Sequence, residues 1–292
     1  MNLSRIMKQL MLCCLGLLAS SALYALQVSD DRGMVLDLPS PAKRVVSLLP
    51  SLSEMVCALQ ACDHLVGVDR NSNFPLTLKN VASLGSGLDP NIEAIVVLKP
   101  DVVVMSHAPR AVERLNSLGV KVLVLEPKTH ADVERVLQRL ATLLGVDGAQ
   151  KLWRSIEAEI NDSANSMPLK SKGARVYFEV NRGPYAASES SFIGEILSRL
   201  GTKNIIPASL GPFPLVNPEF IVKANPEVIF ITAQEASTLS SRPGWGRINA
   251  VQNKHVCVIA NHEEDIIARP GPRMGQAAAI LAHCLLIHGR FE

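Results

Sequence analysis

The segments NIEAIVVLKPDVVVM (residues 91–105) and NPEFIVKANPEVIFI (residues 217–231) follow one pattern in the two halves of the chain. Each has an asparagine, a glutamate two residues later, a mixed apolar stretch, a proline, an acidic residue and an apolar strand-like run. The glutamates are Glu93 and Glu219, and the proline lies seven residues after each of them. Such a repeat indicates two lobes of related structure, and gene duplication is its plain explanation.

The alternation of strands and helices extends outward from these two segments. Continuous apolar strands that alternate with amphipathic helices are typical of a parallel sheet that helices cover on both faces. Ser51 and Glu54 fit a capping box at the start of the first helix. The sequence therefore predicts an α/β protein with two similar lobes. The expected strands lie at residues 44–50, 64–68, 101–105, 120–125, 174–180 and 227–231, with a further short helix and strand within 245–259.

Residues 148–166, GAQKLWRSIEAEINDSANS, place apolar side chains at helical spacing between the two halves. A helix of about 18 residues spans roughly 27 Å, so we expect one rigid helix to join the lobes. Two lobes on one helix leave a ligand cleft between them, at the carboxyl ends of the strands. The expected organisation is a signal peptide at 1–25, a hairpin segment at 26–43, a first lobe at 44–147, a connecting helix at 148–170 and a second lobe at 171–292.

The N-terminus has the features of a secretory signal peptide. Arg5 and Lys8 precede an apolar run, and small residues follow it, with cleavage expected after Ala22 or Ala25. Serines interrupt the run before it reaches the ~20 apolar residues of a membrane span. Without this segment 27 basic and 27 acidic side chains remain, a balance that argues against broad nucleic-acid binding. We therefore expect an exported protein without a nucleic-acid partner.

Four cysteines remain after the expected cleavage, namely Cys57, Cys62, Cys257 and Cys284. An exported protein can oxidise its thiols, and Cys57 and Cys62 are the nearest pair. Five residues at the end of a helix give an awkward geometry for a disulfide. Two interpretations therefore stay open, a disulfide between Cys57 and Cys62 or small buried core residues.

Five segments in order, RVVSLLPSLSEM, GVDRNSNFP, LKPDVVV, SSFIGEILSRLGTKNI and RPGPR, give the chain a family resemblance. The chain resembles the periplasmic substrate-binding proteins of ABC importers for iron–siderophore complexes, haem and cobalamin, and most of all the cobalamin-binding members. The resemblance extends from about Ala42 to Leu286. It implies a periplasmic, monomeric receptor that is not an enzyme, has no cofactor of its own and delivers a bound metal chelate to an inner-membrane importer.

The resemblance also gives a role to the two repeated glutamates. In this family, matching glutamates on the two lobes dock on arginines of the importer's membrane subunits. Glu93 and Glu219 occupy those positions in this chain. A pseudo-symmetric pair of carboxylates suits a partner with two-fold symmetry, and bidentate contacts with arginine fix orientation. The simpler alternative is that both acids only stabilise helix N-termini.

In the second lobe, the resemblance implies four ligand-binding residues. Tyr185 and Phe213 stand in loops rich in glycine and proline, and aromatic rings suit the flat face of a corrin or porphyrin. Asp265 and Arg269 are four residues apart and are expected to hydrogen-bond the rim of the ligand. The alternative for this pair is a local ion pair of little energetic value.

The first lobe departs from the cobalamin-binding pattern, because polar residues stand where aromatic residues are expected. These candidates for ligand contact are Arg70, Asn71, Ser106 and His107. A polar lobe suits haem propionates or a ferric chelate with carboxylates, so these ligands are the alternatives to cobalamin. Haem would also need an axial ligand, for which the candidates are Tyr185, His107 and His262.

Two other classes of protein are alternatives to a receptor of metal chelates. An α/β enzyme is disfavoured, because the sequence has no nucleophile elbow and no zinc-binding HExxH helix. The close pair Ser106 and His107 does not change this, since adjacent residues at a strand end point apart. A receptor for a bare metal ion would need several ligands that converge on the cleft. The candidates His107, His262, Glu263 and Asp265 could form such a set, but one lobe supplies nearly all of them. We therefore expect no metal site.

Overall fold

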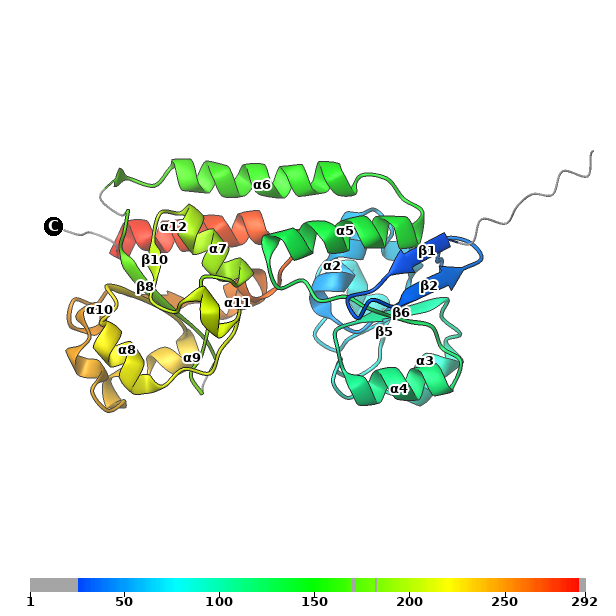
Figure 1. Cartoon of the computed structure of the whole chain (residues 1–292), viewed down its shortest axis with the longest axis horizontal. Coiled ribbons are helices and arrows are strands. Elements are labelled where there is room, and N and C mark those ends of the chain that lie inside the picture. Colours follow the sequence, from blue (N-terminus) through cyan, green and yellow to red (C-terminus); the bar gives the residue numbers. More distant parts are fainter. Residues whose placement is uncertain (1–25, 170–171, 182, 289–292) are drawn as a thin grey trace, which may run out of the picture.

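The computed structural model describes residues 26–169, 172–181 and 183–288, so the predicted signal peptide lies outside the described residues. The chain forms two α/β lobes joined by helix α6 (Ala149–Asn165), which runs along one side of both lobes (Figure 1). The predicted fold class is therefore confirmed.

The first lobe contains a five-stranded parallel sheet in the order β5-β4-β3-β6-β7. Two of its central strands, Val45–Ser47 and Val102–Met105, are wholly buried and consist mostly of valine, as expected of a sheet covered on both faces. The strands are β3 (Val45–Ser47), β4 (Leu65–Val68), β5 (Ala82–Ser83), β6 (Val102–Met105) and β7 (Val122–Val124), and the helices are α2 (Pro50–Ala58), α3 (Ile92–Val97), α4 (Pro109–Ser117) and α5 (His130–Leu144).

The second lobe has a parallel sheet in the order β10-β8-β11-β12, with β9 paired antiparallel to β8. The strands are β8 (Arg175–Asn181), β9 (Tyr185–Ala186), β10 (Lys203–Asn204), β11 (Val228–Thr232) and β12 (Val256–Ile259). The helices are α7 (Phe192–Arg199), α8 (Pro218–Ala224), α9 (Ala233–Ala236), α10 (Asn249–Gln252), α11 (Asn261–Ala268) and α12 (Met274–His288). Helix α12 returns beneath α6 and packs against it (Figure 1).

The segment before the first lobe is a hairpin of β1 (Leu26–Ser29) and β2 (Val35–Leu38). Gly33 supplies the positive φ of +80° that its turn requires. Asp31, at the start of this turn, forms ion pairs with Arg135 and Arg139 of α5. The hairpin is thereby attached to the first lobe.

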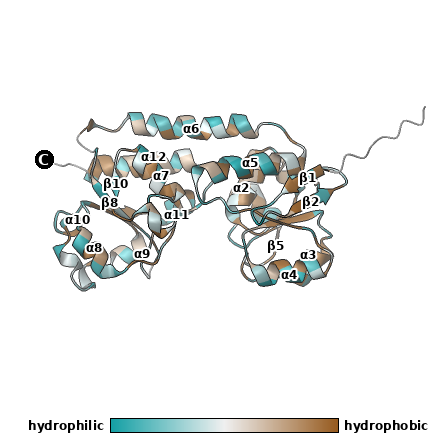
Figure 2. Ribbon diagram, in the orientation of Figure 1, coloured by the Kyte–Doolittle hydropathy of each residue, from teal (hydrophilic) through white to brown (hydrophobic). Residues whose placement is uncertain are grey.

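The largest hydrophobic core is continuous between the lobes. It contains Leu137 of α5, Ile156 of α6, Ile196 of α7 and Leu281 of α12, all fully buried or nearly so. Helix α12 is hydrophobic along most of its length, whereas α6 carries both kinds of residue (Figure 2). Two smaller cores lie on the side away from α6, one in each lobe. The lobes are therefore packed together on the α6 side and separate on the opposite side.

Disulfides join both cysteine pairs of the described chain, Cys57 to Cys62 and Cys257 to Cys284. The first disulfide closes the turn after α2. The second ties strand β12 to helix α12, two elements 27 residues apart in sequence. The structure thus decides the question that the sequence left open, and it adds a pair that the sequence did not suggest.

The predicted capping box at the start of α2 is wrong. Leu49 occupies the N-cap position and makes no side-chain cap, while Pro50 is the first helical residue. Glu54 is instead buried, at 3% exposure, and its carboxylate binds arginines of the other lobe. An ion pair between lobes is available to Glu54 only in the folded chain, so the local pattern could not reveal it.

Candidate functional site

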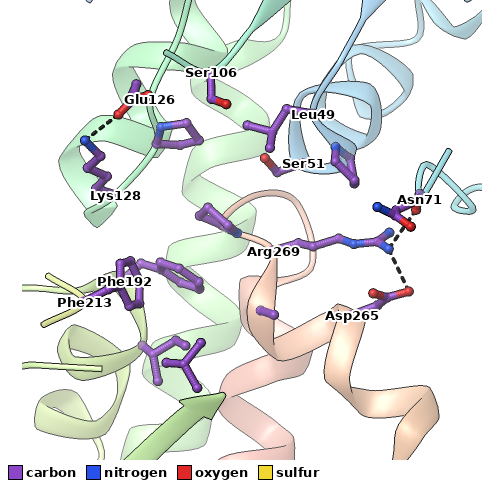
Figure 3. A pocket seen from close by; sticks show the side chains of 16 residues that line it. Leu49, Ser51, Asn71, Ser106, Glu126, Lys128, Phe192, Phe213, Asp265 and Arg269 are labelled. Atoms are coloured by element: carbon purple, nitrogen blue, oxygen red, sulfur yellow. Dashed lines mark hydrogen bonds and ion pairs between the residues drawn. The ribbon is translucent and has the colours of Figure 1, made fainter. Parts of the chain in front are cut away.

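A cavity of about 570 Å³ lies between the lobes. Eight of its lining residues come from each lobe, and Figure 3 shows the two sets facing one another. The first lobe contributes residues that follow β3, β4, β6 and β7. Because all these strands are parallel, their carboxyl ends meet at one edge of the sheet, where α/β proteins place their ligands. The cavity is thus the site predicted by the fold.

The second lobe supplies the apolar wall of the cavity. The rings of Phe192 and Phe213 meet edge to face with their centroids 5.9 Å apart, beside Val180. Phe192 is the first residue of α7, and Ser191 caps this helix by accepting a hydrogen bond from the Gly194 amide. A Cβ atom on Gly194 would lie 1.8 Å from the Ser188 carbonyl oxygen, so glycine is required to seat α7 and Phe192 against the wall.

Glu126 and Lys128 form an ion pair at the rim of the first lobe (Figure 3). Burial opposes ionisation of Glu126, but hydrogen bonds from Lys128 and from the His107 amide outweigh it and hold the Glu126 pKa below its usual value. Glu126 is therefore an anion at neutral pH, and its charge is already matched by Lys128. The pair gives the rim two polar contacts for a ligand without adding net charge.

Arg269 reaches from the second lobe into the first. Its guanidinium donates hydrogen bonds to Glu54 Oε1 and Asn73 Oδ1, both at 2.8 Å, and to the Asn71 carbonyl at 2.9 Å. Asp265 is also within 2.7 Å of it. These partners occupy the guanidinium, so Arg269 holds the lobes together at the floor of the cavity (Figure 3).

Arg273 also reaches across to the first lobe, and with Glu54, Asp265 and Arg269 it forms the Glu54 cluster. Its guanidinium donates to both oxygens of Glu54, at 2.6 and 2.7 Å. It also lies over the Phe74 ring at 4.4 Å. The sequence carries no local sign of this contact, because Glu54 and Arg273 are 219 positions apart.

A second link between lobes lies beside Phe192. The Phe192 amide donates to the Lys128 carbonyl at 2.9 Å, and His130 Nε2 lies 3.1 Å from the Phe192 carbonyl oxygen. Burial lowers the pKa of His130 despite its nearby carboxylates, Glu157 and Glu195. The neutral imidazole therefore prevails at neutral pH, and its Nε2–H donates to the backbone that carries Phe192.

Five of the predicted contact residues line the cavity, namely Asn71, Ser106, Phe213, Asp265 and Arg269. Three do not. Tyr185 is 43% exposed on the short strand β9, which turns its ring outward. Arg70 is exposed in the turn after β4, and its amide donates to the Gly85 carbonyl oxygen. His107 opens to a neighbouring polar cavity, because adjacent residues at the end of β6 point apart. Their role in ligand binding stays a prediction.

Sequence reasoning missed Ser51, Glu126, Lys128 and Phe192. The first three follow predicted strands, so the rule that ligands lie at the carboxyl ends of strands could have found them. Phe192 begins a helix within one of the family segments, SSFIGEILSRLGTKNI. None of the proposed axial ligands, Tyr185, His107 and His262, lines the cavity.

The repeated glutamates occupy equivalent positions on two helices. Glu93 is the second residue of α3 and Glu219 the second residue of α8, and asparagines cap both helices. Both glutamates are exposed, and neither has an ion-pair partner among the residues that the structure describes. Helices α3 and α8 lie on the side of the molecule opposite α6 (Figure 1). The two carboxylates thus face outward from different lobes on one side.

Within the described ranges, no three or more His, Cys, Asp or Glu side chains gather to hold a metal ion. No helix in this part of the chain has the length and apolar character needed to cross a membrane.

Comparison with known proteins agrees with this architecture. An uncharacterised ABC transporter substrate-binding lipoprotein, YvrC of Bacillus subtilis, is 28% identical over 90% of this chain and 86% of its own length. The vitamin B12-binding protein of Pectobacterium atrosepticum is 27% identical over 91% and 92% of the two chains. The haem-binding protein RhuT from Roseiflexus has the same fold, with a TM-score of 0.71 at 22% identity over 85% of this chain and all of its own.

Two α/β lobes on a connecting helix, with a cavity between them, agree with the architecture of these transport-related binding proteins. The chain belongs to the periplasmic binding protein family, whose pattern matches residues 45–262. The predicted family is therefore confirmed.

Proposed function

We propose that the protein captures cobalamin, or a related metal chelate, in the periplasm and delivers it to an inner-membrane ABC importer. The observation that carries this proposal is the interlobe cavity, with aromatic rings on one wall and polar groups on the other. A flat macrocycle with a polar rim is complementary to such a cavity. The likeness to a vitamin B12-binding protein along nearly the whole chain supports cobalamin as the first choice.

Haem or a carboxylate-bearing ferric chelate is the second candidate. The first-lobe wall favours it, since Ser51, Asn71, Ser106 and Lys128 offer hydrogen-bond donors and no aromatic ring. These donors suit propionate or other carboxylate groups. The ligand acts as cargo in either case, and no catalytic step is part of the proposed function.

Calorimetric titration of the ligand-free mature protein with cyanocobalamin and with haemin tests the ligand assignment. We expect saturable one-to-one binding of cyanocobalamin in the submicromolar range. Binding of haemin alone would replace cobalamin with the second candidate. A lack of binding to either compound would refute the proposed ligand class.

Glu93 and Glu219 are proposed to dock the loaded receptor on the importer. Replacing both with glutamine should leave ligand affinity unchanged and reduce ligand uptake by at least about tenfold, because charge-assisted contacts would be lost. Uptake of labelled ligand by cells carrying the variant in place of the native gene measures this. Asp162→Asn, an exposed change on α6 at the opposite side, is the matched control. Normal uptake by the double variant would refute the docking role.

A further inference from the structure

Ser51 differs from the other serines near the cavity because its hydroxyl is buried without a partner. The residue is 2% exposed, and its Oγ has no hydrogen-bond partner among the described residues. Ser53, two positions along the same helix, is also buried, but its Oγ bonds Ser47 Oγ at 2.9 Å and Ser72 Oγ at 3.0 Å. Buried polar groups normally have partners. The unpartnered hydroxyl therefore needs an explanation.

The position of Ser51 explains why its hydroxyl lacks a partner in the protein. Ser51 lines the ligand cavity at the N-terminus of α2. In Figure 3 its side chain lies on the first-lobe wall between Leu49 and Arg269. From the other lobe, Gly271 approaches this turn, since a Cβ atom there would lie 3.7 Å from the Ser51 carbonyl oxygen. The hydroxyl is therefore shielded by protein and adjacent to the space that a ligand would fill.

The start of α2 is also electrically positive and carries no side-chain cap. Leu49 at the N-cap makes no side-chain hydrogen bond, and Pro50 has no N–H to be satisfied. The amides of Leu52 and Ser53 both turn back to the Leu49 carbonyl. The helix macrodipole places partial positive charge at this end. An oxygen acceptor next to Ser51 would be favoured by the hydroxyl and by the dipole together.

The charged side chains of the cavity do not cancel the partial positive charge at the start of α2. Two acids and two bases line it, and each acid has a base as partner, Glu126 with Lys128 and Asp265 with Arg269. Opposite charges so close together largely cancel at a distance. The N-terminus of α2 then adds a positive partial charge that these paired side chains do not cancel.

We propose that the Ser51 hydroxyl and the first turn of α2 form a subsite for an oxygen on the rim of the ligand, either a carboxylate or a carboxamide oxygen. The hydroxyl donates its hydrogen to that oxygen. A carboxylate is bound more tightly than a carboxamide, because only the carboxylate carries the charge that the helix end favours. This inference rests on the proposed function, since it assigns part of the ligand to one wall of the same cavity.

The test compares Ser51→Ala with Ser53→Ala, two removals of a buried hydroxyl from one helix. Wild type and both variants are titrated with haemin, which has carboxylates, and with cyanocobalamin, which has carboxamides. Ser51→Ala should weaken haemin binding about tenfold or more, or cyanocobalamin binding about threefold to tenfold. The melting temperature of ligand-free Ser51→Ala should be unchanged or higher, because an unpartnered polar group is removed. Ser53→Ala should melt at a lower temperature and bind both probes within twofold of wild type.

The outcomes separate this inference from the proposed function. Weaker binding of haemin alone identifies a carboxylate at the subsite, and weaker binding of cyanocobalamin alone identifies a carboxamide. Wild-type affinity of Ser51→Ala for every probe that binds would overturn the subsite and leave the receptor function intact. An equal loss of affinity in Ser53→Ala would also overturn it, by showing an indirect effect through α2. If neither probe binds the wild type, the ligand class and the subsite fall together.

Discussion

At the scale of the residue, Glu54 is the carboxylate around which the two lobes meet. Its side chain is 3% exposed and binds Arg269 and Arg273, which are 8% and 9% exposed. Taking charges out of water is costly, and the cost is offset only by close contact and well-directed hydrogen bonds. Removing one partner from such a cluster leaves the remaining charges buried and uncompensated.

We therefore predict that Glu54→Gln destabilises the ligand-free protein by about 3–5 kcal/mol, because two buried arginines lose their common counter-charge. The free energy of unfolding from guanidinium denaturation measures this. Glu157→Gln is the matched control, since Glu157 also binds an arginine, Arg199, but the pair is 27–30% exposed. The control should cost no more than about 1 kcal/mol. Equal losses in the two variants would contradict the prediction.

At the scale of the element, a disulfide joins strand β12 to helix α12. Among the described residues, strand β12 is the last strand of its sheet and pairs only with β11. The disulfide between Cys257 and Cys284 closes a loop of 27 residues between the strand and the helix. Cross-linking lowers the entropy of the unfolded chain, and it does so more strongly for longer loops.

Replacing Cys257 and Cys284 together with serine should lower the free energy of unfolding by about 3.5 kcal/mol on this entropic account. Replacing Cys57 and Cys62, which close a loop of five residues, should cost less, about 2 kcal/mol. Guanidinium denaturation of the two double variants under oxidising conditions gives both values. A larger loss for the shorter loop would show that loop entropy does not determine the order.

At the scale of the whole molecule, the continuous core limits how far the lobes can move. Helices α5, α6, α7 and α12 contribute side chains to one buried cluster that reaches both lobes. The Glu54 cluster and the hydrogen bond between the Phe192 amide and the Lys128 carbonyl add two further links. Wide opening would break these contacts and expose apolar surface to water.

We predict that ligand binding changes the radius of gyration by no more than about 1 Å, because the interface backbone of pre-organised complexes moves by about that much or less. Small-angle X-ray scattering of the ligand-free and ligand-saturated protein measures the change. A decrease of several ångströms on binding would mean that the lobes separate in the free protein, despite their common core.

The α/β class, the two lobes, the connecting helix and the family are all predictable from the amino-acid sequence. These follow from apolar periodicity, the repeated segments and ordered motifs, which are local properties of the chain. The folded structure, in contrast, establishes which side chains share the cavity. It placed Ser106 inside and His107 outside, and it moved Glu54 from a helix cap to an interlobe ion pair. Contacts between residues 200 positions apart depend on how the lobes pack, and no local pattern carries that information.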